Sequence, residues 1–195
     1  MFPGSEFSWE EDPKRLAFTS ARYKFVAKMV EGMDKVLEVG CNDGYFSRIV
    51  RQHVNHLVGM DSDPEAITIA KKMNSEKWNI YFQQWSIMDS TVLSQPGFDA
   101  VYCLDVFEHI EDENTLLQNL AFFAPMCIIG TPSKESQAYA SEVSKKHHVN
   151  CKTKGELKEA MKKHWKHVLM FGMSDEVLHT GFDPMCQYLF GIGLK

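Results

Sequence analysis

The segment LDVFEHIED, residues 104–112, holds two carboxylates and an imidazole that could act together. Asp105, Glu108 and His109 follow directly on the apolar run FDAVYCL. Side chains of these types serve as general bases and as ligands of divalent cations. Asp105 and Glu108 are three residues apart, so a helical turn would place them on one face. The segment therefore predicts a site that moves a proton or holds a metal ion.

A second polar cluster lies near the end of the chain, in FGMSDEVLHTGFDPM. Asp175, Glu176 and His179 stand there beside Gly181, between two apolar runs. One interpretation is recognition of a reacting molecule, with His179 as a base. The other is a plain connection, whose acids cap turns and whose histidine is solvated. Both interpretations stay open at this point.

The stretch KVLEVGCNDG, residues 35–44, combines a carboxylate with a glycine turn. Glu38 ends a hydrophobic strand, and Gly40 and Gly44 follow with Asn42 between them. Glycines let a ligand approach the backbone, and asparagine tolerates the left-handed conformation. An anionic Glu38 disfavours a pyrophosphate and favours a cationic, carbon-rich ligand. The competing interpretation is a tight turn with a purely structural role.

The elements that must position these side chains alternate between strands and helices. We expect strands at 35–40, 56–61, 79–84, 98–106 and 126–130, and helices at 14–33, 44–54, 63–73 and 111–123. This alternation predicts a parallel sheet covered on both faces. The second strand ends in Asp61, placed to accept hydrogen bonds from both hydroxyls of a ribose.

In the last third of the chain, strands and helices no longer alternate regularly. Residues 132–150 are polar, and we expect them to be irregular. A helix at 153–165 and two closing strands at 167–173 and 186–192 should follow. In the first helix, Arg22, Tyr23 and Phe25 could cover a bound ligand as a lid, but the favoured interpretation places Phe25 in the core and Arg22 at the surface.

Three stretches together resemble the class I S-adenosylmethionine-dependent methyltransferases over residues 34–131. LEVGCNDG resembles their first motif, GMDSDPEAI their second and FDAVYCLDVFEHI their fourth. The resemblance implies an α/β, doubly wound, Rossmann-like sheet of seven mostly parallel strands with an antiparallel last strand. Residues 1–195 would form one domain: a helix or lid at 14–33, a cofactor-binding core at 34–131 and an acceptor segment with closing strands at 132–195.

The resemblance also implies which residues bind S-adenosylmethionine. Glu38 would place the methionine end and Asp61 the ribose, while Asn42 departs from the usual glycine. The full expected set is Glu38, Gly40, Asn42, Gly44, Asp61, Ser62, Asp89, Leu104 and Asp105. The third motif is less distinct: Asp89 is the favoured partner of the adenine amino group, and Ser86 is the alternative.

The D-x-x-E-H run resembles the E-x-x-E-H motif of the ubiquinone-biosynthesis O-methyltransferases and the small-RNA 2′-O-methyltransferases. That likeness implies a divalent cation, Mg²⁺, Mn²⁺, Fe²⁺ or Zn²⁺, which would lower the pKa of the acceptor oxygen. The implied ligands are Asp105, Glu108, His109 and His148. The alternative is a metal-free site in which His109 is the base or shapes the pocket. The candidate catalytic residues are His109, His148 and His179.

Composition limits the classes of partner. The formal net charge is −5 and the sequence pI is about 5.9, which argues against a broad nucleic-acid surface. The five cysteines are scattered, and the acidic N-terminal segment is unlike a signal peptide. The sequence also lacks a long apolar run. We therefore expect a cytoplasmic protein without a membrane span.

The expected function is O-methylation of a small-molecule hydroxyl, on a sugar or a phenol. An RNA 2′-O-methyltransferase and a non-catalytic, cofactor-binding regulatory subunit are the alternatives.

Overall fold

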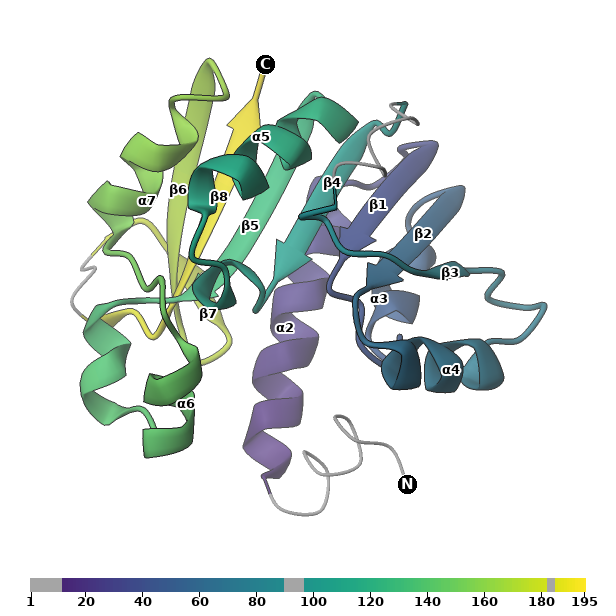
Figure 1. The fold of residues 1–195 in the computed structure, drawn as a ribbon, viewed down its shortest axis with the longest axis horizontal. Coiled ribbons are helices and arrows are strands. Elements are labelled where there is room, and N and C mark those ends of the chain that lie inside the picture. Colours follow the sequence, from purple (N-terminus) through teal and green to yellow (C-terminus); the bar gives the residue numbers. More distant parts are fainter. Residues whose placement is uncertain (1–11, 90–96, 182–184) are drawn as a thin grey trace.

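The computed structural model describes residues 12–89, 97–181 and 185–195. Their strands form one sheet in the order β3-β2-β1-β4-β5-β8-β6-β7 (Figure 1). The strands are β1 Lys35–Val39, β2 His56–Asp61, β3 Tyr81–Gln84, β4 Ala100–Leu104, β5 Met126–Pro132, β6 His167–Ser174, β7 Val177–His179 and β8 Tyr188–Leu194. The first five are parallel, and β8 runs antiparallel between β5 and β6.

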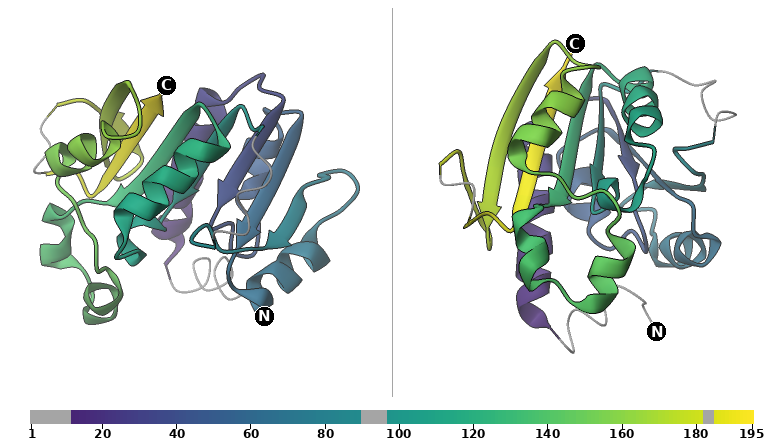
Figure 2. Two further views of the ribbon diagram at one scale, coloured as in Figure 1. Left: turned by 45° about the horizontal axis from the view of Figure 1, so that its top comes forward. Right: turned by 60° about the vertical axis from the view of Figure 1, so that its left-hand side comes forward.

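Helices cover both faces of the sheet (Figure 2). They are α2 Pro13–Met29, α3 Ser47–Arg51, α4 Pro64–Met73, α5 Glu113–Phe123, α6 Glu142–His147 and α7 Lys154–Met161, with 3₁₀ turns η2 Phe107–His109 and η3 Glu135–Tyr139. Strand β4 is buried throughout. Its Val101 and Cys103 belong to the core on the face covered by α5 and α7, whereas Tyr102 and Leu104 belong to the core on the face covered by α2, α3 and α4. The sheet thus separates two apolar cores.

The expected fold class is confirmed, but the sheet has eight strands within the described residues rather than seven. The additional strand is β7, which pairs antiparallel with the end of β6. Asp175 and Glu176 form the two-residue turn between them, and Asp175 has φ +53°. A positive φ in a two-residue turn suits the right-handed twist of a hairpin, which explains the extra strand.

The segment 132–150 also differs from the irregular path expected from its polarity. It contains η3 and α6, and the Ser141 side chain caps α6 by accepting a hydrogen bond from the Ser144 N–H. Figure 1 shows α6 below the carboxyl end of β5, on the side of the molecule that holds β6 and β8. Among the helices of the described residues, none is long and apolar enough to cross a membrane.

Helix α2 places one side chain where the sequence did not lead us to expect it. Phe25 packs against Phe171 and Phe190, in agreement with a core position. The Arg22 side chain, however, is only 20% exposed and lies 3.8 Å over the Tyr188 ring. The surface position expected for Arg22 is therefore wrong. A cation–π contact and an ion pair with Asp105 compensate the partly buried guanidinium.

A close contact between β8 and the α7 side of the sheet gives a test of this packing. A Cβ at Gly193 would lie 2.6 Å from two ring atoms of Trp165, which is buried. We expect Gly193→Ala to lower the free energy of unfolding by about 1–3 kcal/mol, because the ring must shift in a filled core. Urea unfolding measures the change.

The matched control is Gly155→Ala in the first turn of α7, where a Cβ would meet no atom within 4 Å. It should leave stability unchanged or raise it by up to about 1 kcal/mol, since alanine favours the helix. Equal stability of the two variants would contradict the packing described for β8.

Candidate functional site

The glycine turn after β1 brings the chain back against β2. The Gly40 and Cys41 N–H groups donate to the Met60 carbonyl at 2.8 and 3.0 Å. Gly40 and Asn42 have φ values of +79° and +48°. A Cβ at Gly40 would collide with the Val106 side chain. The turn therefore needs glycine at this position and leaves its backbone open to close approach by a ligand.

Glu38 lies beneath this turn and is 1% exposed. The Tyr23 hydroxyl donates to its Oε1 at 2.8 Å, and the nearby Ser47 and Tyr102 hydroxyls also favour its charged form. Burial raises the pKa of Glu38 from 4.5 to about 7. Burying a charged carboxylate is costly, and a nearby cation would reduce the cost. This arrangement fits a positively charged ligand.

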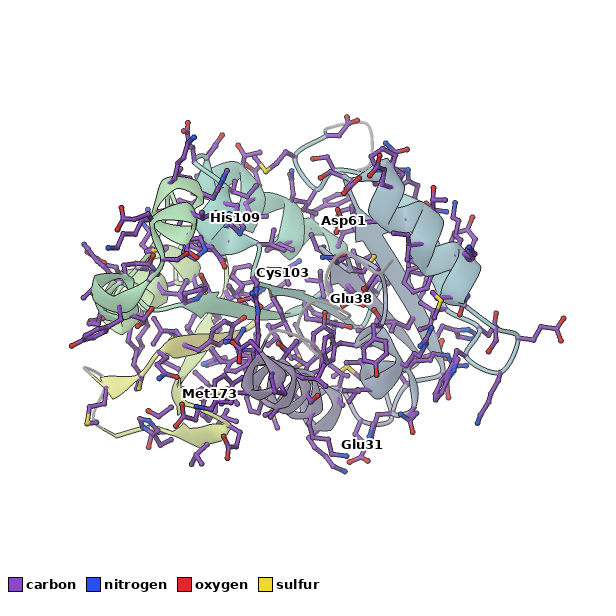
Figure 3. The ribbon with its side chains drawn as sticks, turned by 90° about the horizontal axis from the view of Figure 1, so that it is seen from below. Glu31, Glu38, Asp61, Cys103, His109 and Met173 are labelled. Atoms are coloured by element: carbon purple, nitrogen blue, oxygen red, sulfur yellow. The ribbon has the colours of Figure 1, made fainter. Side chains whose placement is uncertain are left out.

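Asp61 ends β2 on the other side of the turn. Its Oδ2 accepts from the Asn42 N–H at 2.9 Å, and its Oδ1 accepts from the Asp63 N–H at 3.0 Å. These bonds fix the carboxylate at the carboxyl edge of the sheet, seen end-on in Figure 3 with Glu38 and His109. Each oxygen keeps a further lone pair, so Asp61 fits a pair of ribose hydroxyls.

Two cavities flank the glycine turn and share Gly40, Asn42 and Asp105 as lining residues. We call them the α2 cavity and the β2 cavity. The α2 cavity is also lined by Arg15, Thr19, Arg22, Tyr23, Phe46 and Leu104. The β2 cavity is also lined by Asp61, Ser62, Trp85, Ser86, Val106 and His109. An elongated ligand could therefore lie across the turn, with one end in each cavity.

Not all of the residues expected to bind the cofactor line these cavities. Glu38 lies one hydrogen bond behind the wall of the α2 cavity, because its partner Tyr23 forms that wall. A Cβ at Gly44 would press on the Phe82 ring, so this glycine serves packing. At the third motif, Ser86 lines the β2 cavity, whereas Asp89 is not among its lining residues. The geometry favours the alternative, Ser86.

The helix α2 contributes residues that the motif analysis missed. Arg15, Thr19 and Arg22 all line the α2 cavity. They are spaced by four and three residues, the period of a single helix face. The sequence suggested Arg22 only as part of a lid and gave no role to Arg15 or Thr19, because the helix lies outside the recognised motifs.

Glu108, His109 and His148 come together beside the β2 cavity. Each offers one ligand atom, and these atoms lie within 4.8 Å of one another. The imidazole centroids of the two histidines are 5.1 Å apart, and the Thr131 hydroxyl donates to Glu108 Oε2 at 3.0 Å. One carboxylate and two imidazoles form a donor set used for Zn²⁺ and Fe²⁺. The three residues therefore fit a divalent cation.

The electrostatics of this group also favour a cation. Glu108 is 1% exposed, and burial, followed by the charge of Asp105, raises its pKa well above the usual value. Burial, followed by the neighbouring His109, lowers the pKa of His148. A neutral imidazole can donate its lone pair to a metal or accept a proton.

Asp105 does not join these three residues. Its backbone has φ +55°, and Arg22 Nη1 donates to both of its carboxylate oxygens at 3.2 and 3.0 Å. The structure thus assembles three of the four expected metal ligands and turns the fourth toward α2. A guanidinium ion pair holds Asp105 at the junction of the two cavities.

His179 lies away from this group, on β7 at the edge of the sheet. Its Nε2 is 3.1 Å from Ser174 Oγ and 3.4 Å from Cys186 Sγ. Strand β7 is five positions from β1 in the sheet, or about 24 Å at the usual strand spacing. The structure therefore does not bring His179 to either cavity.

Comparisons with known proteins agree with this arrangement. A family model described as a methyltransferase domain matches residues 37–123. The ubiquinone biosynthesis O-methyltransferase of Haemophilus ducreyi is 30% identical over 105 residues, which are 50% of this chain and 44% of that protein. The chain spans about half the length of the curated relatives it matches.

Two solved structures share the fold over nearly the whole chain. One is a chain of the complex between the Haloferax volcanii Trm112 methyltransferase activator and a putative methyltransferase, with a TM-score of 0.75, 16% identity and coverage of 97% of this chain and 96% of that chain. The other is the methyltransferase domain of bacterial CtHen1-C, with a TM-score of 0.73, 18% identity and coverage of 91% and 98%.

The matched segment 37–123 contains the glycine turn, Asp61 and the turn η2. The resemblance drawn from the motifs is thereby confirmed, together with S-adenosylmethionine as the cofactor of the family. Residues 37–123 match the methyltransferase domain family, and the chain shares the fold of the class I S-adenosylmethionine-dependent methyltransferases.

Proposed function

We propose that the protein transfers a methyl group from S-adenosylmethionine to a hydroxyl of a small molecule. The observation that carries this proposal is His109, which lines the β2 cavity and also belongs to the Glu108–His109–His148 group. The group that could activate an acceptor therefore adjoins the cavity proposed for the cofactor. The similarity to ubiquinone biosynthesis O-methyltransferases supports an oxygen acceptor.

The two cavities suggest how the cofactor would be divided between them. The methionine end would occupy the α2 cavity, with its carboxylate near Arg15 and Arg22 and its positive charges above Glu38. The nucleoside would occupy the β2 cavity, with its ribose at Asp61 and its adenine at Ser86. The sulfur would then lie near Gly40 and Asp105, which both cavities share.

Activation of the acceptor would depend on the Glu108–His109–His148 group. A divalent cation held there would bind the acceptor oxygen and lower its pKa. Two imidazoles and one carboxylate favour Mn²⁺, Fe²⁺ or Zn²⁺ over Mg²⁺, which prefers oxygen ligands. The chain's own contribution is to hold Glu108 buried against Thr131 while His109, 43% exposed, faces the cavity.

Methyl transfer from labelled S-adenosylmethionine, measured with phenolic, sugar and small-RNA acceptors, tests this function. Turnover with a phenol or a sugar is the expected result. Transfer only to a 2′-hydroxyl of RNA would assign the alternative acceptor. Cofactor binding without turnover on any class would instead support the non-catalytic subunit.

The affinity for S-adenosylmethionine should depend on the protonation of Glu38. Below pH 7 the buried carboxyl of the free protein holds a proton, since burial raises the Glu38 pKa to about 7. A cationic ligand requires its loss, so affinity should rise about tenfold per pH unit from pH 5 to 6.5 and level off above pH 7. Calorimetric titration measures the profile.

The Glu38→Gln variant serves as the control for this profile. It carries no proton to lose, so it should bind more weakly and with little dependence on pH in the same range. A wild-type profile as flat as that of Glu38→Gln would contradict the role given to Glu38.

The metal proposal predicts a joint loss of binding and activity. Glu108→Gln and His148→Ala should each abolish Mn²⁺ binding and lower turnover at least about a hundredfold, because the acceptor proton would no longer be removed efficiently. Calorimetry with Mn²⁺ and turnover assays measure the two effects. His167→Ala, an exposed position at the start of β6, is the matched control. Full wild-type activity in excess chelator would refute the metal and leave His109 as a metal-free base.

A further inference from the structure

Both histidines of the Glu108–His109–His148 group use Nδ1 to contact an oxygen. His109 Nδ1 lies 3.0 Å from the backbone carbonyl of His147. His148 Nδ1 lies 3.1 Å from Oε1 of Gln137. Carbonyl and amide oxygens only accept hydrogen bonds, so each Nδ1 must carry the hydrogen. In a neutral ring the lone pair then resides on Nε2.

This tautomer matters for a ligand site. A histidine that binds a metal through one nitrogen commonly donates the other N–H to a carbonyl or carboxylate oxygen, which fixes the ring and strengthens the ligand. His109 Nε2 lies 4.0 Å from Glu108 Oε1, on the side of the group where the carboxylate lies. The two oxygen contacts therefore leave Nε2 of each histidine free to bind a cation or accept a proton.

The two contacts differ in where they come from. The partner of His109 is a backbone oxygen, which no side-chain substitution removes. The partner of His148 is the side chain of Gln137, a half-buried residue of η3. Its Nε2 faces the Ser136 hydroxyl at 3.5 Å, so the amide oxygen is the atom turned toward His148. Gln137 is the residue of this pair whose role can be tested directly.

We propose that Gln137 is a positioning residue, which fixes His148 as the Nδ1–H tautomer and so presents its Nε2 to Glu108 and His109 for a divalent cation. The inference deepens the proposed function and rests on its metal site for the identity of the ligand. The tautomer itself is a property of the metal-free protein and can be measured without it.

The test compares three forms of the full chain, labelled with ¹⁵N-histidine and free of metal. Long-range ¹H–¹⁵N correlation spectra report which nitrogen carries the hydrogen, and His148→Gln assigns the signal. Wild type and Gln137→Glu, which keeps an acceptor, should show the Nδ1–H tautomer. Gln137→Met, which has nearly the same length but no amide, should shift His148 toward the Nε2–H form. An Nε2–H tautomer in wild type, or an unchanged one in Gln137→Met, overturns the proposal.

Calorimetric titration with Mn²⁺ gives the second readout. Gln137→Met should bind Mn²⁺ about 10- to 100-fold more weakly than wild type, as expected for loss of a hydrogen bond to a metal ligand. Gln137→Glu keeps an acceptor for that hydrogen bond and should bind Mn²⁺ with an affinity like that of wild type. Gln52→Met is the matched control, because the Gln52 amide donates to the Arg48 carbonyl at the end of α3. Affinity in Gln137→Met equal to that of wild type overturns the role toward the cation.

The two readouts separate the failure of this inference from that of the proposed function. If wild type binds no Mn²⁺, the metal site fails, and the tautomer spectra alone then confirm or overturn the role of Gln137. If wild type binds Mn²⁺ and the spectra of Gln137→Met match those of wild type, the metal site stands and the inference fails.

Discussion

Two carboxyl groups buried at the carboxyl edge of one sheet set the electrostatic constraint on this protein. Glu38 and Glu108 are each 1% exposed, and burial is the largest cause of the raised pKa of both. In the free protein, protonation neutralises such a group at the lowest cost in free energy. Bound near Glu38, the positive charge of a sulfonium nucleoside would take the place of the proton on that carboxyl. A divalent cation at Glu108 would do the same there. The cofactor and the proposed metal ion would thus both compensate the buried negative charge.

Asp105, paired with Arg22, lies at the junction of the two cavities. Asp105 follows β4, the strand next to β1, and its N–H donates to the Gly130 carbonyl of β5. Arg22 reaches it from α2 while resting on the Tyr188 ring of β8. The N-terminal helix and the antiparallel strand therefore meet at the centre of the edge. The ion pair links the proposed methionine site to the closing part of the sheet.

The features of the site and the sheet that depend on short stretches of sequence could be predicted. Glu38 and Asp61 each stand at the end of an apolar run, and Gly40 marks a turn that no larger residue could make against Val106. The order of these signals along the chain gives the parallel sheet. Strand β7 was not predictable, because it depends on a hairpin turn at Asp175 and has only three residues. The positions of Arg22 and Asp105 were missed for another reason: their ion pair joins residues 83 apart in sequence.

The proposed acceptor site around η2 and α6 was still harder to predict from the sequence, because contacts between residues distant in sequence hold it together. After α6 the chain returns to η2, where the Asn150 N–H donates to the Glu108 carbonyl at 3.0 Å and its side-chain amide donates to the Ile110 carbonyl at 3.1 Å. Lys152 then bridges to Ser133 just after β5 and pairs with Glu113 at 2.7 Å. These bonds hold the segment that carries His148 against the segment that carries His109. Phe107 and Ile110 anchor η2 in the apolar core, whereas α6 has no buried residue, so its position depends on such hydrogen bonds. The groups proposed to activate the acceptor are therefore held in part by hydrogen bonds, and small polar side chains around them would decide the geometry of the site.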